Sequence, residues 1–196
     1  MKIIQRISLL LLIINSTSLN LSSAYKVNDK KIFELDIHKT DGHLDASIFN
    51  KWFPADLFKS EIKMDYYGKT KVNGPFQFDL SDFQIKSVSD NVFSEYILSS
   101  SLYLDHNNIT EIPLGVFDNQ EKLEILYLQN NNIKSLDKQL LADLTKLEVL
   151  NLENNKLSAL DGETFETLVA LKELYICSNS LKYLDRSMIK PLKNLE

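Results

Sequence analysis

The chain has little of several residue types, and each scarcity excludes a class of protein. Only five of its 196 residues are glycine and four are proline, which excludes a collagen-like or proline-rich chain. One cysteine and three histidines are little material for a dedicated zinc site, which usually takes three or four such ligands. Acids outnumber bases, with a net charge of −5, whereas a general nucleic-acid binder needs positive charge to displace phosphate counterions.

The residues that are present indicate a globular protein. Hydrophobic residues make up 44% and charged residues 25%, and the length suits one domain, or one domain plus a small cap. The motifs G-x-S-x-G, the phosphate loop and H-E-x-x-H are absent, and the acids are spread along the chain. We therefore expect no enzyme, no cofactor and no metal.

Residues 1–24 have the pattern of a secretory signal peptide. Lys2 and Arg6 form a positive start, Ile7–Ile14 is a short apolar stretch, and Ser22–Ala24 supplies small residues for cleavage. As a helix the apolar stretch is about 12 Å long, far short of a bilayer core of about 30 Å. This predicts a secreted, extracellular protein with no membrane insertion within this chain.

Two residues bear on that prediction. Cys177 is the only cysteine and cannot close a bridge within the chain, so it is a packed thiol, a reactive thiol or half of an intermolecular disulfide. Asn108, in the triplet Asn-Ile-Thr, is an N-glycosylation acceptor and suits an exposed loop.

The second half of the chain repeats every 24 residues. Seven columns of similar residues recur at this step, six of them apolar and one of asparagine. The first apolar column contains Leu123, Leu147, Leu171 and Leu195, and the asparagine column contains Asn107, Asn131, Asn155 and Asn179.

The segments 123–133 (LEILYLQNNNI) and 147–157 (LEVLNLENNKL) follow the pattern L-x-x-L-x-L-x-x-N-x-L. In this the chain resembles the extracellular leucine-rich-repeat family with repeats of this length. The resemblance implies an α/β-type solenoid, with short parallel strands on a concave face and an irregular or short helical convex side. Its repeats would be 99–122, 123–146, 147–170 and 171–194, after a degenerate repeat at 75–98 and before a further start at 195–196.

The spacing has a physical explanation. Leucines at alternate positions lie on one face of a short strand, and the next repeat places an equivalent strand beside it. The asparagine side chains can bond the backbone of the turn after the strand, so we expect a structural ladder of them. In the degenerate repeat Phe83 replaces this asparagine, so that turn must be built differently.

Residues 25–74 differ from the repeats and are expected to form a β-containing cap without cysteines. Apolar residues alternate at Phe33, Leu35 and Ile37 and again at Ile62, Met64 and Tyr66, while Lys69–Gly74 resembles a turn. His38 and His43 lie among aspartates, a pattern more typical of a polar loop than of a metal site.

At the C-terminal end the last repeat is incomplete. Either the native chain is longer, or a partner protects the last coil.

The candidate functional surface is the concave face. Taking the first leucine as position one, positions three, five, seven and eight point there, and over five repeats they contain three tyrosines, five acids and no lysine or arginine. The candidate partner-binding residues are Asp79, Tyr103, Asp105, Tyr127, Gln129, Asn151, Glu153, Glu173 and Tyr175. Tyrosine is enriched at binding hot spots, and the acids predict an extracellular protein or glycoprotein partner with a basic patch. Alternatively, Tyr103 and Tyr127 pack as a surface ladder and the acids aid solubility.

Three functions fit this surface. The first is a secreted binding module, which resembles soluble recognition proteins of innate immunity because the cap lacks cysteine. The second is the N-terminal part of a membrane receptor, and the third is an extracellular-matrix or adhesion component. A disulfide-linked or non-covalent oligomer is compatible with each. His106 beside Asp105 is interpreted as a surface polar residue rather than a metal ligand.

Overall fold

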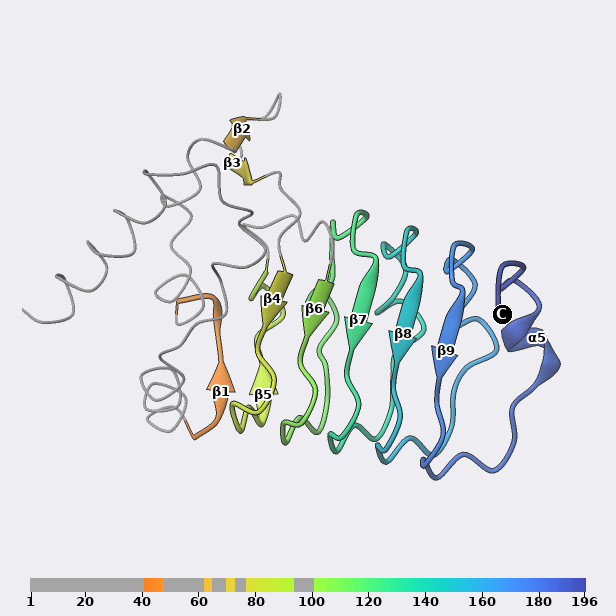
Figure 1. The fold of residues 1–196 in the computed structure, drawn as a ribbon. Coiled ribbons are helices and arrows are strands. Elements are labelled where there is room, and N and C mark those ends of the chain that lie inside the picture. Colours follow the sequence, from red (N-terminus) through yellow and green to blue (C-terminus); the bar gives the residue numbers. More distant parts are fainter. Residues whose placement is uncertain (1–40, 48–61, 65–69, 73–76, 94–100) are drawn as a thin grey trace, which may run out of the picture.

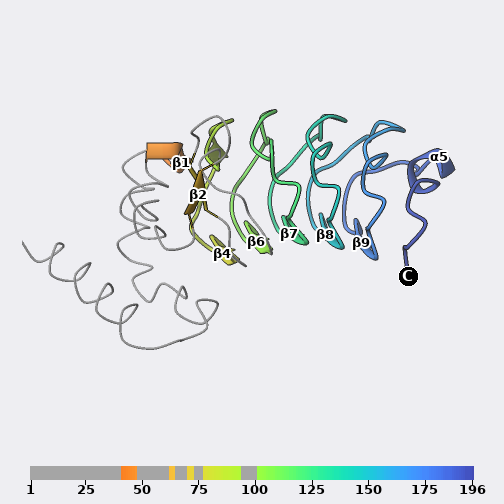
Figure 2. The same cartoon turned by 90° about the horizontal axis from the view of Figure 1, so that it is seen from above.

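The structure is a computed structural model that describes residues 41–47, 62–64, 70–72, 77–93 and 101–196. Its main feature is a five-stranded parallel sheet in the order β4-β6-β7-β8-β9 (Figure 1). The strands are β4 (Gln77–Asp79), β6 (Ser101–Tyr103), β7 (Ile125–Tyr127), β8 (Val149–Asn151) and β9 (Glu173–Tyr175). Between strands the chain loops away from the sheet and returns, so that the coils stack side by side (Figure 2). The predicted α/β solenoid is therefore confirmed.

Every strand pairing within the five-stranded sheet joins residues 24 positions apart. Leu102 lies opposite Leu126, Leu126 opposite Leu150, and Leu150 opposite Leu174. The degenerate repeat keeps this register, since Phe78 pairs with Leu102. Backbone bonds continue the ladder beyond each strand; for example, the N–H of Leu128 donates to the Asn151 carbonyl at 2.8 Å.

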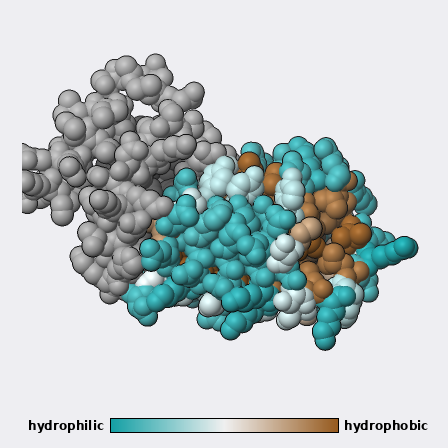
Figure 3. All heavy atoms as spheres, turned by 60° about the horizontal axis from the view of Figure 1, so that its bottom comes forward, coloured by the Kyte–Doolittle hydropathy of each residue, from teal (hydrophilic) through white to brown (hydrophobic). Residues whose placement is uncertain are grey.

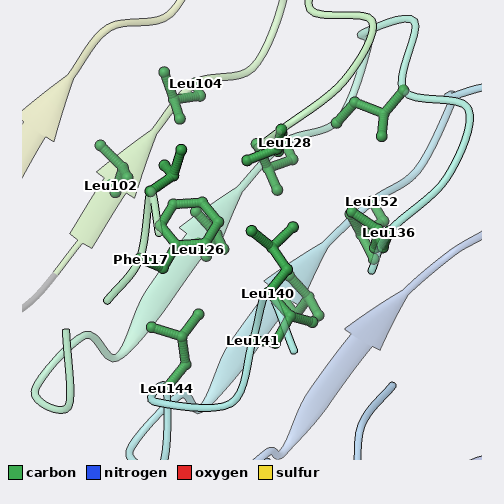
Figure 4. Packing of buried hydrophobic residues seen from close by; sticks show 14 of the residues in the cluster. Leu102, Leu104, Phe117, Leu126, Leu128, Leu136, Leu140, Leu141, Leu144 and Leu152 are labelled. Atoms are coloured by element: carbon green, nitrogen blue, oxygen red, sulfur yellow. The ribbon is translucent and has the colours of Figure 1, made fainter. Parts of the chain in front are cut away.

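The core lies between the sheet and the returning limb of each coil (Figure 4). Leu102, Leu126 and Leu150 on the strands are fully buried, and so are Phe117 and Phe165 on the returning limbs. A single coil cannot bury its own apolar side chains on both limbs. This core therefore exists only because neighbouring coils stack on one another.

The asparagine column fastens each coil to the one before it. The Oδ1 atom of Asn131 accepts a bond from the N–H of Ile109 at 3.0 Å, and its Nδ2 donates to the Leu104 carbonyl at 2.9 Å. Asn155 and Asn179 repeat these contacts one and two coils later. These bonds satisfy buried backbone groups that would otherwise lack partners.

The first turn is built differently, because Phe83 replaces the asparagine. Its side chain is buried, and Asn107 bonds this turn from the next coil, as Asn131 does for the turn after it. The Oδ1 atom of Asn107 accepts from the N–H groups of both Phe83 and Ile85, each at 3.0 Å. An apolar side chain thus takes the place of the asparagine, and Asn107 accepts the N–H of Phe83 in addition to the bond that recurs along the column.

A second column, at position eight, adopts left-handed backbone conformation. Its members have φ between 52° and 59° and are Asp82, His106, Asn130, Asn154 and Ser178. Aspartate, asparagine and histidine tolerate this conformation better than most residues, because short polar side chains bond locally. The repeated backbone turn after each strand therefore explains the polar character of this column.

Two short sheets involve the region before the repeats. Strand β1 (His43–Leu44) runs parallel to β5 (Ser87–Val88), and β2 (Ile62–Met64) pairs antiparallel with β3 (Thr70–Val72). The strand pattern expected from Ile62 is found in β2. The turn predicted at Lys69–Gly74 is wrong for Thr70–Val72, where β-branched residues favour a strand.

His43 uses both ring nitrogens within this part of the chain. Its Nδ1 lies 2.8 Å from the Ser87 hydroxyl and its Nε2 lies 3.2 Å from that of Ser89. The other expectations for the cap, at Phe33–Ile37 and His38, lie outside the described residues, as does the signal peptide.

The last coil leaves apolar side chains exposed. Leu195 is 38% exposed, whereas Leu171, one repeat earlier in the same column, is fully buried. Helix α5 (Arg186–Ile189) lies at this end, with Ile189 exposed and Met188 buried. Figure 3 shows the resulting apolar patch on the C-terminal end. Within the described ranges, no helix is both long and apolar enough to cross a membrane.

Candidate binding face

The last residue of each sheet strand belongs to one column that faces away from the leucine core. Because side chains alternate along a strand, the residues flanking each buried leucine point to the opposite face. Tyr103, Tyr127, Asn151 and Tyr175 are therefore neighbours in register on β6 to β9. Exposure increases toward the edge strand: Tyr103 and Tyr127 are half-buried, and Tyr175 is 44% exposed.

Tyr103 and Tyr127 contact each other edge to face. Their ring centroids are 5.1 Å apart and the ring planes meet at 84°. This geometry places the positive edge of one ring against the negative face of the other. Burial, with the nearby Tyr103, Glu173 and Asp105, raises the pKa of Tyr127. The contact between these two tyrosines agrees with the alternative interpretation, in which they pack as a surface ladder, and it lies in a negative environment.

Tyr175 is held by a carboxylate on its own strand. Its hydroxyl donates to the Glu173 carboxylate at 2.6 Å. This bond is the main cause of the raised pKa of Tyr175, to which the charge of Glu173, burial, Tyr127 and Glu153 also contribute. Tyr127 and Tyr175 therefore share the influence of Glu173, although Asn151 separates them in register.

Asp105 differs from the expectation of an exposed acid. It is buried, and its carboxylate lies 2.7 Å from Nδ1 of His106. The Asn130 amide donates to Nε2 of His106 at 2.9 Å, and an amide nitrogen can only donate, so the ring proton lies on Nδ1. The Asn154 amide donates in turn to Oδ1 of Asn130. Asp105 is thus tied into a polar chain across three coils.

Sequence reasoning did not single out Asn130 and Asn154 as members of this chain. Both were placed on the concave face at position eight, but only their common left-handed backbone brings them together. In the sequence, the only indication of this chain was that position eight is polar in every repeat. The hydrogen bonds between these side chains depend on how successive coils stack.

Two further candidates form local bonds with residues that directly follow their own strands. Oδ1 of Asp79 accepts from the N–H of Ser81 at 3.1 Å and also from its hydroxyl. Oδ1 of Asn151 accepts from the N–H of Glu153 at 2.9 Å, and the side chain of Glu153 is half-exposed. Gln129 differs, since its buried Oε1 has no hydrogen-bond partner among the described residues.

The remaining candidates are Cys177 and Asn108, and both are exposed. Cys177 is a free, exposed cysteine, which excludes the packed-thiol alternative. Asn108 is exposed in the turn after β6, and its backbone N–H donates to the Ile85 carbonyl at 2.8 Å. In the part of the chain that the structure describes, no group of three or more His, Cys, Asp or Glu is placed to hold a metal.

Comparison with known families identifies this arrangement. The family model described as "Leucine rich repeat" matches residues 100–157 and 145–196. This chain is a leucine-rich-repeat protein. No similar protein was found among the curated proteins.

Two solved leucine-rich-repeat structures have the same fold. They are the leucine-rich repeat domain of APL1B and the APL1 leucine-rich repeat domain, each 28% identical over 61% of this chain with a TM-score of 0.57. The match covers 34% and 31% of those chains, so this leucine-rich-repeat chain spans about a third of their length. A scaffold of this kind typically binds proteins and is not catalytic.

Proposed function

We propose that this chain is a secreted binding module that recognises an extracellular protein or glycoprotein through its concave face. The observation that carries the proposal is the column of Tyr103, Tyr127 and Tyr175, which projects from a rigid sheet beside Glu153 and Glu173. Tyrosines on a rigid support offer a large contact area, and little conformational entropy is lost when they bind.

The charge of the face supports a basic partner. Glu173 is exposed and Glu153 half-exposed, while positions three, five, seven and eight of the repeats contain no lysine or arginine. Lys172, next to Glu173, is paired with Glu148 at 2.8 Å. A positive patch on a partner would meet this surface with favourable steering, so association would be faster at low salt.

Secretion and recognition in innate immunity belong to the same proposal. The pattern of residues 1–24 supports secretion, and the exposed Asn108 is open to glycosylation. The exposed Cys177 is available for a disulfide to a second chain. Enzymatic activity is not part of the proposal.

The test is a paired capture from the native extracellular fluid. Wild type and the variant Tyr127→Ala/Glu153→Lys serve as baits, and mass spectrometry compares the eluates. The matched control is Tyr183→Ala/Glu166→Lys, which makes the same chemical changes at exposed sites away from the face. We expect a partner that wild type and control retain and the face variant loses.

Equal recovery on the folded face variant would contradict the proposal and move the site elsewhere on the molecule. Thermal unfolding of all three proteins comes first, because loss of partner counts only if the face variant is folded.

A further inference from the structure

The column of tyrosines has a gap at Asn151. Tyr127 and Tyr175 lie on either side of it in register, on strands β7 and β9. Neighbouring strands are about 4.8 Å apart, so the two tyrosine backbones are separated by about 10 Å. Asparagine is much shorter than tyrosine, so the row of aromatic side chains is interrupted between Tyr127 and Tyr175.

The floor of the gap is held down. Oδ1 of Asn151 accepts from the N–H of Glu153, so the amide lies along its own strand instead of reaching between the tyrosines. The side chain is half-buried, as a floor would be.

Both walls are positioned before any partner arrives. Tyr127 packs edge to face against Tyr103 on one side, and the Tyr175 hydroxyl is bonded to Glu173 on the other. Binding then costs little side-chain entropy, because these rings are already ordered.

The surroundings of the gap are negative and offer acceptors. The Glu173 carboxylate bonds the Tyr175 hydroxyl at 2.6 Å, and burial and Tyr103 together with this carboxylate raise the pKa of Tyr127. Glu153 lies two residues beyond the floor and is half-exposed. On the same face, the Gln129 amide has an acceptor oxygen without a partner among the described residues, which a donor could satisfy after a rotation of the amide.

We propose that this gap is a subsite for one arginine side chain of the protein partner. Its guanidinium would lie between Tyr127 and Tyr175 over Asn151, paired with Glu153 and Glu173. A planar cation suits a slot with aromatic walls, because it stacks on the rings and presents several donors to carboxylates at once. The subsite rests on the proposed function and specifies what the concave face recognises.

The test uses a short probe and the full chain. The probe is the peptide acetyl-Gly-Arg-Gly-amide, and NMR follows the ring resonances of the tyrosines as it is added. A second peptide replaces arginine with citrulline, which has nearly the same shape without the charge. We expect saturable shifts at Tyr127 and Tyr175 with arginine, and binding weaker by about tenfold with citrulline.

Two variants at the floor give a matched comparison. Asn151→Tyr fills the gap with the residue that its neighbours in the column already have, and should abolish the arginine-dependent shifts. Asn151→Ser keeps the gap open and still provides an acceptor for the Glu153 N–H, so it should bind like wild type. Equal binding of arginine and citrulline, or unchanged binding by folded Asn151→Tyr, would overturn the subsite.

Failure of the subsite and failure of the proposed function are distinguishable. A partner captured through Tyr127 and Glu153 but retained by Asn151→Tyr would leave the binding face in place and refute the arginine subsite. Arginine-peptide binding without any captured protein partner would support the subsite and contradict the proposed function.

Discussion

Oδ1 of Asn155 accepts a hydrogen bond from the backbone N–H of Ile133, 22 residues earlier and one coil back. Its Nδ2 donates to the Leu128 carbonyl of that same coil and to the Leu152 carbonyl of its own. One buried side chain therefore fastens two coils together, and the bonds recur at each member of the asparagine column.

We expect Asn155→Ala to destabilise the protein by about 3 kcal/mol, because it leaves buried donors and acceptors of two coils unpaired. The control is Asn132→Ala, the same change one residue after another member of the column, at a half-buried side chain. That control should change stability by less than about 0.5 kcal/mol. Urea denaturation of both variants measures the difference, and equal losses would refute the special role of the column.

The column at position eight, with its left-handed backbone, predicts that stability depends on which residue replaces the asparagine. At Asn130, φ is 56° and the side chain bonds both His106 and Asn154. Asn130→Val should cost about 1–3 kcal/mol, since a β-branched residue is strained in this conformation. Asn130→Gly loses the same side-chain bonds without the strain and should be the more stable of the two. Thermal melts compare them; a valine variant as stable as the glycine variant would contradict backbone strain as the cause.

Leu150 tests the stacked core. It is fully buried on β8, so Leu150→Ala should reduce the free energy of unfolding by about 2–5 kcal/mol and lower secretion. Val169→Ala is the control, because Val169 is apolar but 54% exposed. It should leave the free energy of unfolding within about 0.5 kcal/mol of wild type. Chemical denaturation and secreted yield are the measurements, and equal effects would argue against the stacking of β8 in the core.

The tyrosine titrations provide a test without any partner. Glu173→Gln removes the carboxylate that bonds the Tyr175 hydroxyl, so the pKa of Tyr175 should fall toward its ordinary value of 10.0. The pKa of Tyr127 should fall less, because burial is its leading cause. NMR of the ring carbons over an alkaline pH series measures both. A larger fall at Tyr127 than at Tyr175 would contradict the arrangement.

The same shifts predict the direction of alkaline destabilisation. A raised pKa means that the folded chain keeps protons that the unfolded chain releases. The free energy of unfolding therefore falls as the pH rises above about 10, and Glu173→Gln should reduce this dependence. Urea melts at pH 8 and at alkaline pH measure the change. An increase in the free energy of unfolding over this range would contradict the raised pKa values of the two tyrosines.

The sequence by itself determined the fold and the placement of the columns. A 24-residue period with Leu-x-Leu alternation fits one arrangement, in which Leu102, Leu126 and Leu150 lie side by side in the core. The degenerate copy at Phe78 was also detectable, because its apolar residues keep the period. Periodicity could not reveal the strand at Thr70–Val72, which lies outside the repeats.

Only the tertiary structure decided what the columns do. It buried Asp105 beside His106, set Tyr103 edge to face with Tyr127, and bonded Tyr175 to Glu173. Periodicity places a residue in a column, but the direction and partner of each side chain depend on rotamers and on distances between stacked coils. These quantities exist only once the coils have packed against one another.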